Sequence, residues 1–190
     1  MKALPIAACV LLGLGAASPA RAQTPVALPA FDSVELRGGG HVTLRHGPVQ
    51  RVTLVRGSTE MTGFAVDGRG RLTIEACVRS CRDYDLQIEI VTPAIEAAAV
   101  RGGGSIDAGS GFPGQEQLAV AVTGGGAIDL RGIRARNVAA AVTGGGSILT
   151  SAEDSLAANV SGGGEIAYWG DPQVTQAVSG GGAVARGGAR

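Results

Sequence analysis

The sequence has few cationic residues and no long apolar segment in its main part. Lysine occurs only as Lys2, and once residues 1–22 are set aside, 14 arginines remain against 16 acidic residues, a formal charge of −2. A chain with this charge has no excess of basic residues to bind nucleic acids or anionic membranes. We therefore expect no nucleic-acid partner. The apolar run at residues 4–17 is too short for a transmembrane helix.

Motifs of common enzyme classes are missing as well. No glycine triplet continues into the ending of a phosphate-binding loop, and no Gly-x-Ser-x-Gly hydrolase motif occurs. His41 and His46 lie five residues apart on one expected strand and face opposite sides, so a shared metal is not expected. Asp107 and Asp129 each follow a glycine triplet by three residues, but three other repeats carry aliphatic residues there, which argues against calcium. We expect no catalytic residue, metal or cofactor.

The N-terminus has the features of a signal peptide. Lys2 precedes an apolar run, and Ala20-Arg21-Ala22 is a small-x-small cleavage site. We therefore expect export from a Gram-negative cytoplasm, with cleavage near Ala22 and a final location in the periplasm or on the cell surface. Lipoprotein processing at Cys9 is a rival interpretation, but Cys9 precedes most of the apolar segment.

Two cysteines remain after the signal peptide. Cys77 and Cys81 are an even pair in an exported chain, so we expect them to form a disulfide. A redox or zinc pair is the alternative. The spacing of three intervening residues differs from the redox motif, and no second ligand pair for zinc is present.

The chain beyond residue 22 is expected to form one domain. Residues 23–30 are a proline-containing leader, and residues 31–190 are the domain itself. Apolar and polar residues alternate throughout residues 31–95, which predicts a less regular region of half-buried strands. Asp67-Gly68 predicts a tight hairpin, and the segment from Cys77 to Arg82 predicts another, between strands at 72–76 and 84–91.

Residues 96–185 repeat a motif of three glycines followed by one variable residue and an aliphatic one. The triplets begin at steps of 22, 20, 18 and 18 residues, and a sixth, more distant copy lies near the start of the domain. A repeat with a nearly constant period predicts stacked units that bury their apolar faces against each other, with the triplets as tight corners. The structural corners are Gly38, Gly39, Gly40, Gly102, Gly103, Gly104, Gly124, Gly125, Gly126, Gly144, Gly145, Gly146, Gly162, Gly163, Gly164, Gly180, Gly181 and Gly182.

The stacked-corner hypothesis has two further consequences. The alanine-rich returns at 119–121 and 139–141 are expected to fill a narrow interior. A valine at Gly125 or Gly145 is expected to block a corner and to destabilise the protein several times more than Val160→Ala.

The chain resembles the head GIN domain family, whose label is "putative auto-transporter adhesin". The resemblance is carried by residues 31–36 (Phe-Asp-Ser-Val-Glu-Leu), 40–44 (Gly-His-Val-Thr-Leu), 72–74 (Leu-Thr-Ile) and 90–93 (Ile-Val-Thr-Pro), then by the triplets, and it spans residues 31–185. The family usually has Gly-Ser-Gly at its corners, whereas the middle residue here is always glycine. The resemblance implies an all-β fold, a right-handed parallel β-helix (β-solenoid) of bacterial envelope proteins.

These features together predict a non-catalytic exported envelope protein, an adhesin or a surface binding module. A periplasmic structural or accessory protein is the alternative, and a polysaccharide-acting enzyme is the third. Tyr168 and Trp169 are the candidate binding residues, because an exposed aromatic pair stacks on sugars, although they could instead close the apolar end of the stack. The partner would be a glycan or another envelope protein, and the polar tail at 186–190 leaves an uncapped end where a second copy could associate.

Overall fold

The structure is a computed structural model that describes residues 23–79, 81 and 84–188. The expected signal peptide, residues 1–22, lies outside the described residues. All regular secondary structure within them is β, which confirms the all-β class. No helix long and apolar enough to cross a membrane was found in that part of the chain.

The described chain forms one sheet of 15 strands. Their bounds are β1 Thr24–Val26, β2 Ser33–Gly38, β3 His41–His46, β4 Arg51–Arg56, β5 Gly63–Val66, β6 Arg71–Glu75, β7 Gln87–Thr92, β8 Ala97–Gly102, β9 Ser105–Ala108, β10 Gln115–Gly124, β11 Ala127–Gly144, β12 Ser147–Gly162, β13 Glu165–Trp169, β14 Gln173–Ser179 and β15 Ala183–Arg186.

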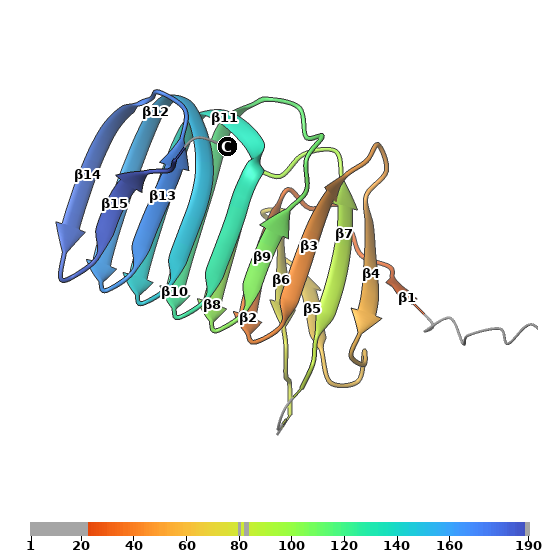
Figure 1. Cartoon of the computed structure of the whole chain (residues 1–190). Coiled ribbons are helices and arrows are strands. Elements are labelled where there is room, and N and C mark those ends of the chain that lie inside the picture. Colours follow the sequence, from red (N-terminus) through yellow and green to blue (C-terminus); the bar gives the residue numbers. More distant parts are fainter. Residues whose placement is uncertain (1–22, 80, 82–83, 189–190) are drawn as a thin grey trace, which may run out of the picture.

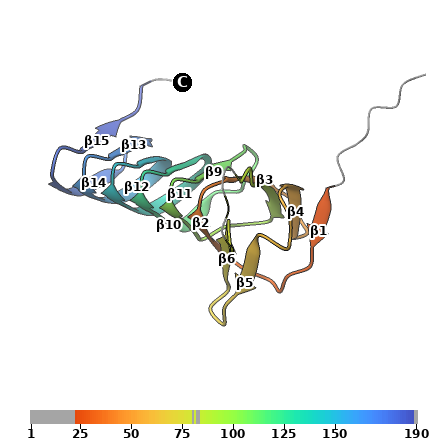
Figure 2. The ribbon, with the colours of Figure 1, turned by 90° about the horizontal axis from the view of Figure 1, so that it is seen from below.

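The sheet curls back on itself into two facing walls (Figure 1). Wall A holds β5, β6, β2, β8, β10, the C-terminal halves of β11 and β12, and β14. Wall B holds β1, β4, β7, β3, β9, the N-terminal halves of β11 and β12, β13 and β15. A wall A strand, its glycine corner and the wall B strand that follows make one rung. Figure 2 shows the strands in a row from β14 and β15 at one end to β1 at the other.

Successive rungs pair in parallel without a shift at the corners. Val142 lies opposite Val122 on one side and Val160 on the other, and Gly144 lies opposite Gly124 and Gly162. Beyond the corner, Ile148 pairs with Ile128 and Ile166 in the same manner. The sequence period therefore becomes a set of straight columns of equivalent residues, as the stacked-unit hypothesis predicted.

The N-terminal part departs from a simple coil. The rung β2–β3 lies between β6–β7 and β8–β9, so the rungs are out of chain order. The pairs β1–β4, β4–β7 and β5–β6 are antiparallel, so the sheet is mixed. The Asp67-Gly68 turn joins the antiparallel β5 and β6 as predicted. The second predicted hairpin is wrong, because β6 and β7 lie in different walls. Residues 24–26 of the expected leader form β1.

The core lies between the two walls. Columns of β-branched residues run through it, including Val100, Val122, Val142 and Val160 from wall A, all at most 1% exposed. Each such side chain contributes about 1.5–3 kcal/mol when fully buried. The alternation along each strand sends the neighbours of these residues to the outer face. The prediction that the alanine-rich returns fill the interior is therefore wrong for Ala119, Ala121, Ala139 and Ala141, which are exposed.

The three glycines of a corner are not equivalent. Gly144 has φ +116°, and a Cβ there would lie 2.6 Å from the carbonyl oxygen of Gly124 in the rung below. At Gly146 a Cβ would lie 2.5 Å from Val122 Cγ1 and would also meet the carbonyl of Gly126. Nothing lies within 4 Å of the corresponding position at Gly145. The expectation that a valine at a middle glycine blocks the corner is therefore wrong, because the middle residue points into open space.

We predict that Gly144→Ala and Gly146→Ala each lower the free energy of unfolding by about 3 kcal/mol. The new Cβ would strain the backbone or overlap atoms of the rung below, and the stacked backbones cannot move apart to make room for it. Gly145→Ala should change it by no more than about 0.5 kcal/mol, as an exposed substitution. Urea unfolding of the oxidised protein measures all three. Equal losses at the three positions would contradict the stacked-corner geometry.

Candidate binding surface

A shallow groove of about 650 Å³ runs along the outer face of wall A. Alanine methyl groups from successive rungs form its floor, and the groove crosses the sheet from β2 to β14. The outward-facing alanines that line it are Ala97, Ala99, Ala119, Ala121, Ala139, Ala141, Ala157 and Ala177. We call these residues the alanine face.

The strict register explains why the alanine face is flat. Ala119 lies opposite Ala97 and Ala139, and Ala121 lies opposite Ala99 and Ala141. Neighbouring strands are about 4.8 Å apart, so the methyl groups form two straight rows with that repeat. Asn159 interrupts the second row between Ala141 and Ala177. Alanine is depleted in strands, and an outer face normally carries polar side chains. A contiguous group of apolar side chains at outward positions, where polar residues are usual, makes this groove a candidate interaction surface.

A row of hydroxyl groups borders the alanine face on the side of the glycine corners. Its members are the exposed Thr123, Thr143, Ser161 and Ser179, which are in register across four rungs. An apolar floor with a polar margin is the usual composition of a binding surface.

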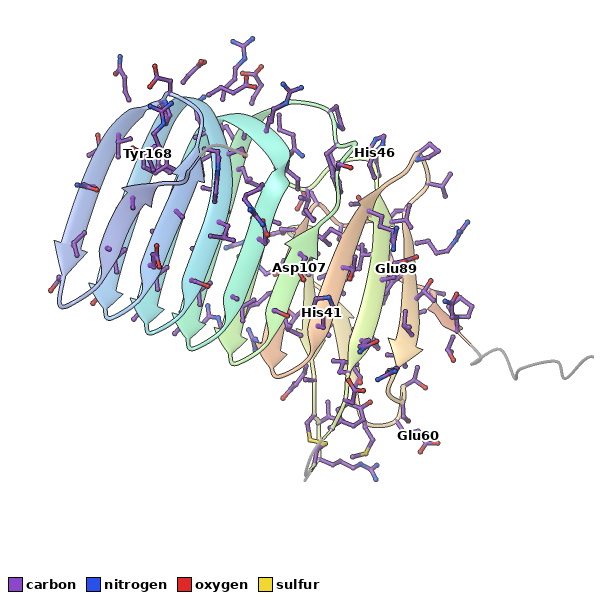
Figure 3. All side chains as sticks on the ribbon, viewed as in Figure 1. His41, His46, Glu60, Glu89, Asp107 and Tyr168 are labelled. Carbon is purple, nitrogen blue, oxygen red and sulfur yellow. A yellow bond between two sulfur atoms is a disulfide. The ribbon has the colours of Figure 1, made fainter. Side chains whose placement is uncertain are left out.

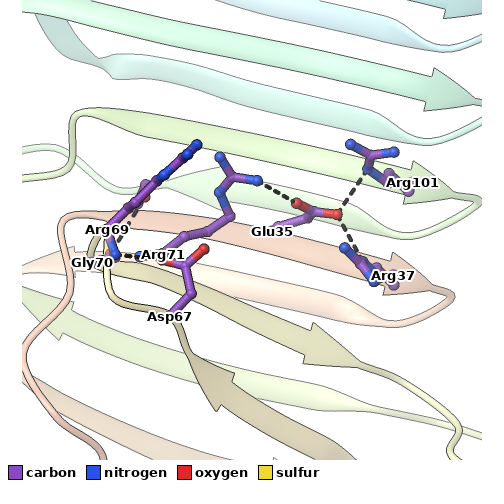
Figure 4. Close-up of polar contacts among 8 residues, drawn as sticks. Glu35, Arg37, Asp67, Arg69, Gly70, Arg71 and Arg101 are labelled. Atoms are coloured by element: carbon purple, nitrogen blue, oxygen red, sulfur yellow. Dashed lines mark hydrogen bonds and ion pairs between the residues drawn. The ribbon is translucent and has the colours of Figure 1, made fainter.

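One end of the groove carries a cluster of three arginines around a single carboxylate (Figure 4). Glu35 is only 2% exposed, and its Oε1 lies 2.7 Å from Arg37 Nε and 2.8 Å from Arg101 Nε. Its Oε2 lies 3.4 Å from Arg71 Nη1. We call these four residues the arginine cluster. They come from the adjacent strands β2, β6 and β8.

The electrostatics of the arginine cluster leave an excess of positive charge. Arg37 and Arg101 are directly opposite in register, a like-charge pair that would repel without Glu35. Burial alone would raise the pKa of Glu35, but the hydrogen bond from Arg37 and the charges of Arg101, Arg37 and Arg71 outweigh it and lower that pKa. Glu35 is therefore ionised, and these four residues have a net charge of +2 with guanidinium groups that remain about half exposed. The carboxylate of Glu75, directly opposite Arg37 on β6, offsets part of this charge next to Arg37.

Tyr168 and Trp169, the binding residues predicted from the sequence, lie on β13 in wall B and do not line this groove. Trp169 donates a hydrogen bond from Nε1 to the carbonyl oxygen of Gly188 at 2.9 Å. The guanidinium of Arg131 lies over its ring, 5.0 Å from the centroid. Tyr168 is partly buried against the core. A ligand role for the pair stays a prediction.

The two histidines are apart, as their spacing predicted, and each has its own contacts (Figure 3). His41 Nε2 lies 3.2 Å from Asp107 Oδ2, and His41 Nδ1 lies 2.8 Å from Ser105 Oγ. Burial raises the pKa of the Asp107 carboxyl. The charge of Asp129 raises it further, and the charge of His41 offsets part of the increase. His46 packs edge-on against Phe112, with ring centroids 5.6 Å apart.

Asp107 and Asp129, weighed as calcium ligands, are directly opposite each other on β9 and β11. Asp129 is engaged by Arg131, whose Nη2 lies 2.5 Å from Asp129 Oδ2. A search of the described residues found no group of three or more His, Cys, Asp or Glu side chains placed to hold a metal ion.

The structure contains the expected disulfide between Cys77 and Cys81. It closes a short loop in the segment that leads from β6 in wall A to β7 in wall B. This segment replaces the glycine corner of the other rungs. The disulfide does not line the groove.

Sequence reasoning missed the groove and the arginine cluster, although the sequence carried a signal for both. Arginine precedes the triplet only at Arg37 and Arg101, where the other copies have threonine or serine. Glu35 lies two residues before Arg37, and so faces the same side of the strand. The alternation of Val120 and Val122 with alanine likewise fixes which alanines face outward.

Comparison with known proteins confirms the family resemblance over part of the chain. Residues 114–172, which run from just before β10 to just before β14, match the family described as "Putative auto-transporter adhesin, head GIN domain". No curated protein shows significant similarity to the chain.

Solved structures resemble this chain to different degrees. A "putative adhesin" from Bacteroides fragilis superposes with a TM-score of 0.54 at 17% identity, over 89% of this chain and 97% of that chain. A "putative adhesin" from Parabacteroides distasonis gives a TM-score of 0.43 at 17% identity, over 87% and 96% of the two chains. A "Putative lipid binding protein" from the same species gives 0.41 at 16% identity, over 88% and 96%. The first of these likenesses supports the fold assignment, at an identity that carries no residue roles.

We predict that Glu35→Gln lowers the free energy of unfolding at neutral pH by about 1–3 kcal/mol, because charge-assisted hydrogen bonds from arginine are lost. The folded-state pKa of Glu35 is lowered, so its contribution is present above the unfolded pKa and disappears as the pH falls through the folded pKa. The difference between variant and wild type should therefore vanish in acid.

Unfolding in urea across the acid range measures this prediction. The control is Glu165→Gln, an exposed carboxylate on β13, which should behave like wild type. A constant difference at every pH would show that Glu35 acts through packing and not through its charge.

Proposed function

We propose that this protein is a non-catalytic, adhesin-like binding module of the bacterial cell envelope. The family description and the fold of the B. fragilis "putative adhesin" support this class. The proposal includes a signal peptide at residues 1–22, a single domain over residues 31–190, and export to the periplasm or cell surface. The regular rungs from β8 to β15 are proposed to wind as a right-handed parallel β-helix, which their parallel register supports.

The observation that carries the proposal is the alanine face with the arginine cluster at its end. Two rows of methyl groups offer a long, flat apolar floor without pockets for individual side chains. An extended chain with flat apolar faces, such as a polysaccharide, fits this shape better than a globular ligand. The bordering hydroxyl groups can donate hydrogen bonds to sugar oxygens and accept them from sugar hydroxyls.

The arginine cluster determines the charge of the proposed ligand. Arginine presents a planar fork of donors that binds carboxylate or phosphate oxygens in a bidentate manner. Glu35 satisfies part of this capacity, and the half-exposed guanidinium groups of Arg71 and Arg101 supply the rest. The proposed ligand is therefore an acidic polysaccharide whose apolar sugar faces lie on the alanines.

Glu35 is the one carboxylate that lines the groove, and its ionised state argues against a hydrolytic function there. Enzymes that cleave glycosidic bonds use a pair of carboxyl groups, one of which must be protonated. Glu35 has a lowered pKa and three arginine partners, so it is a poor proton donor. A binding role agrees with this geometry.

We predict that Ala141→Glu, in the middle of the alanine face, weakens binding to polygalacturonate at least about tenfold, because it puts a negative charge under the polymer. Ala127→Glu is the matched control, since Ala127 is an exposed alanine on the outer face of wall B. Calorimetric titration of the purified protein measures both, with neutral dextran as the uncharged polymer. Equal affinity of the two variants for polygalacturonate would exclude the alanine face as the site.

We predict that protease added to intact cells cleaves the native protein while a periplasmic protein survives. Adhesion requires a location outside the outer membrane, whereas an accessory protein is enclosed by it. Protection until the outer membrane is opened would make the periplasmic accessory function the better interpretation.

A further inference from the structure

The two ends of the strand stack are built differently. At the N-terminal end the outermost strands are β1, which contains Pro25, and β5, which has 4 residues. Both pair in an antiparallel manner with the strand inside them. Proline and short length are features by which natural sheets protect their edges from further pairing.

At the C-terminal end, β15 is short, with 4 residues, but β14 has neither proline nor short length. Within the described residues, β14 pairs only with β12, and β15 pairs only with β13. Strand β14 has 7 residues, Gln-Val-Thr-Gln-Ala-Val-Ser, with no charge and no proline. A long, uncharged edge strand leaves a row of backbone N–H and C=O groups available to another strand.

Core positions are exposed at this end as well. Val178 occupies the column of Val160 and Val142, which are buried, yet it is 43% exposed. Val174 continues the column of the buried Leu156 and is 37% exposed. The last rung therefore keeps the apolar residues that would pack against one more rung.

We propose that a second copy of this chain covers this end, with the two β14 edges paired in antiparallel manner across a two-fold axis. A two-fold interface needs a surface that is complementary to itself. An uncharged edge meets this condition because no like charges are brought together. The axis passes between the two copies of Gln176, so Val174 of each copy lies opposite Val178 of the other.

The side chain of Gln176 favours the register in which the two copies of this residue lie opposite each other. It faces inward, in the column that Ala158 and Ala140 occupy in the preceding rungs. In the dimer each Gln176 amide meets its equivalent across the axis, where an amide can both donate to and accept from its partner. A polar pair in an apolar interface fixes register in other assemblies, because any shift leaves it unpaired.

The same rotation turns the two β15 edges toward each other on wall B. The proposed interface consists of one strand edge in each wall, so we expect a weak association in which monomer and dimer exchange with concentration. The inference concerns the end of the stack and holds whether or not the alanine face binds a polysaccharide.

Sedimentation velocity on the purified chain of residues 23–190, across low to high micromolar concentrations, tests the dimer. The wild type should shift from monomer to dimer, and Val178→Lys should raise the dissociation constant at least about tenfold, because a charge is placed in the paired edge. Val49→Lys is the matched control, since Val49 is 66% exposed near the opposite end. A wild type that stays monomeric, or a dimer disrupted only by Val49→Lys, overturns the proposal.

Cross-linking tests the register. Directly opposed residues on paired strands have Cβ atoms about 4.5–5.5 Å apart, within reach of a disulfide on slight adjustment, so Gln176→Cys should give a covalent dimer on oxidation. Thr175→Cys is the control, because that side chain faces outward and its equivalent lies diagonally across the axis. A covalent dimer from Thr175→Cys but not from Gln176→Cys overturns the register centred on Gln176.

Discussion

The structure depends on backbone hydrogen bonds that connect one glycine corner to the next. The carbonyl of Gly124 accepts from the N–H of Gly145 at 3.0 Å, and the carbonyl of Gly126 accepts from the N–H of Ser147 at 3.0 Å. These contacts hold successive corners so close that a Cβ on Gly144 would collide with the carbonyl below it. The corners therefore fix the register of both walls at once in the rungs that contain a triplet, because each strand of these rungs starts or ends at a corner.

Exact stacking turns a repeat in the sequence into a pattern on the surface. Residues that occupy the same position before successive triplets lie in one column of the sheet. A different residue in one repeat therefore changes the surface chemistry at one place in that column. The hydroxyl row ends where Thr123 gives way to Arg101, and the alanine row ends where Ala99 gives way to Glu35. The arginine cluster is thus the position where the repeat sequence changes its chemistry while its geometry continues.

Local sequence features predicted much of the fold. The alternation of apolar and polar residues predicted the strands, and the glycine triplets predicted the corners. Strands and corners both depend on backbone geometry within a few residues, which a local pattern can indicate. The order of the rungs could not be obtained in this way, since the pairing of β2 with both β6 and β8 joins segments far apart in the chain. The triplet at residues 38–40 carried a hint, because Gly38 lies opposite Gly102 in the structure.

The binding surface was missed for a different reason. Sequence reasoning placed the alanines inside because they are small and apolar, but the side on which a strand residue lies is decided by its neighbours. Val120 and Val122 face inward, so Ala119 and Ala121 must face outward whatever their own hydrophobicity. A contiguous group of apolar residues on the outer face is then a feature that stability of the core does not explain, which makes the group, unlike a single exposed alanine, informative about function.

A stack of rungs that all pair in the same way can accept a further rung at either end. Each rung presents the next with the same hydrogen-bonding groups and the same apolar columns, so an end must be made by a change in sequence. At the N-terminal end this change is visible in the antiparallel strands β1 and β5. Strand β14 keeps the repeat pattern to its last residue, and its exposed valines lie where every earlier rung is covered. The difference between the ends follows if one end terminates the stack and the other joins it to a partner.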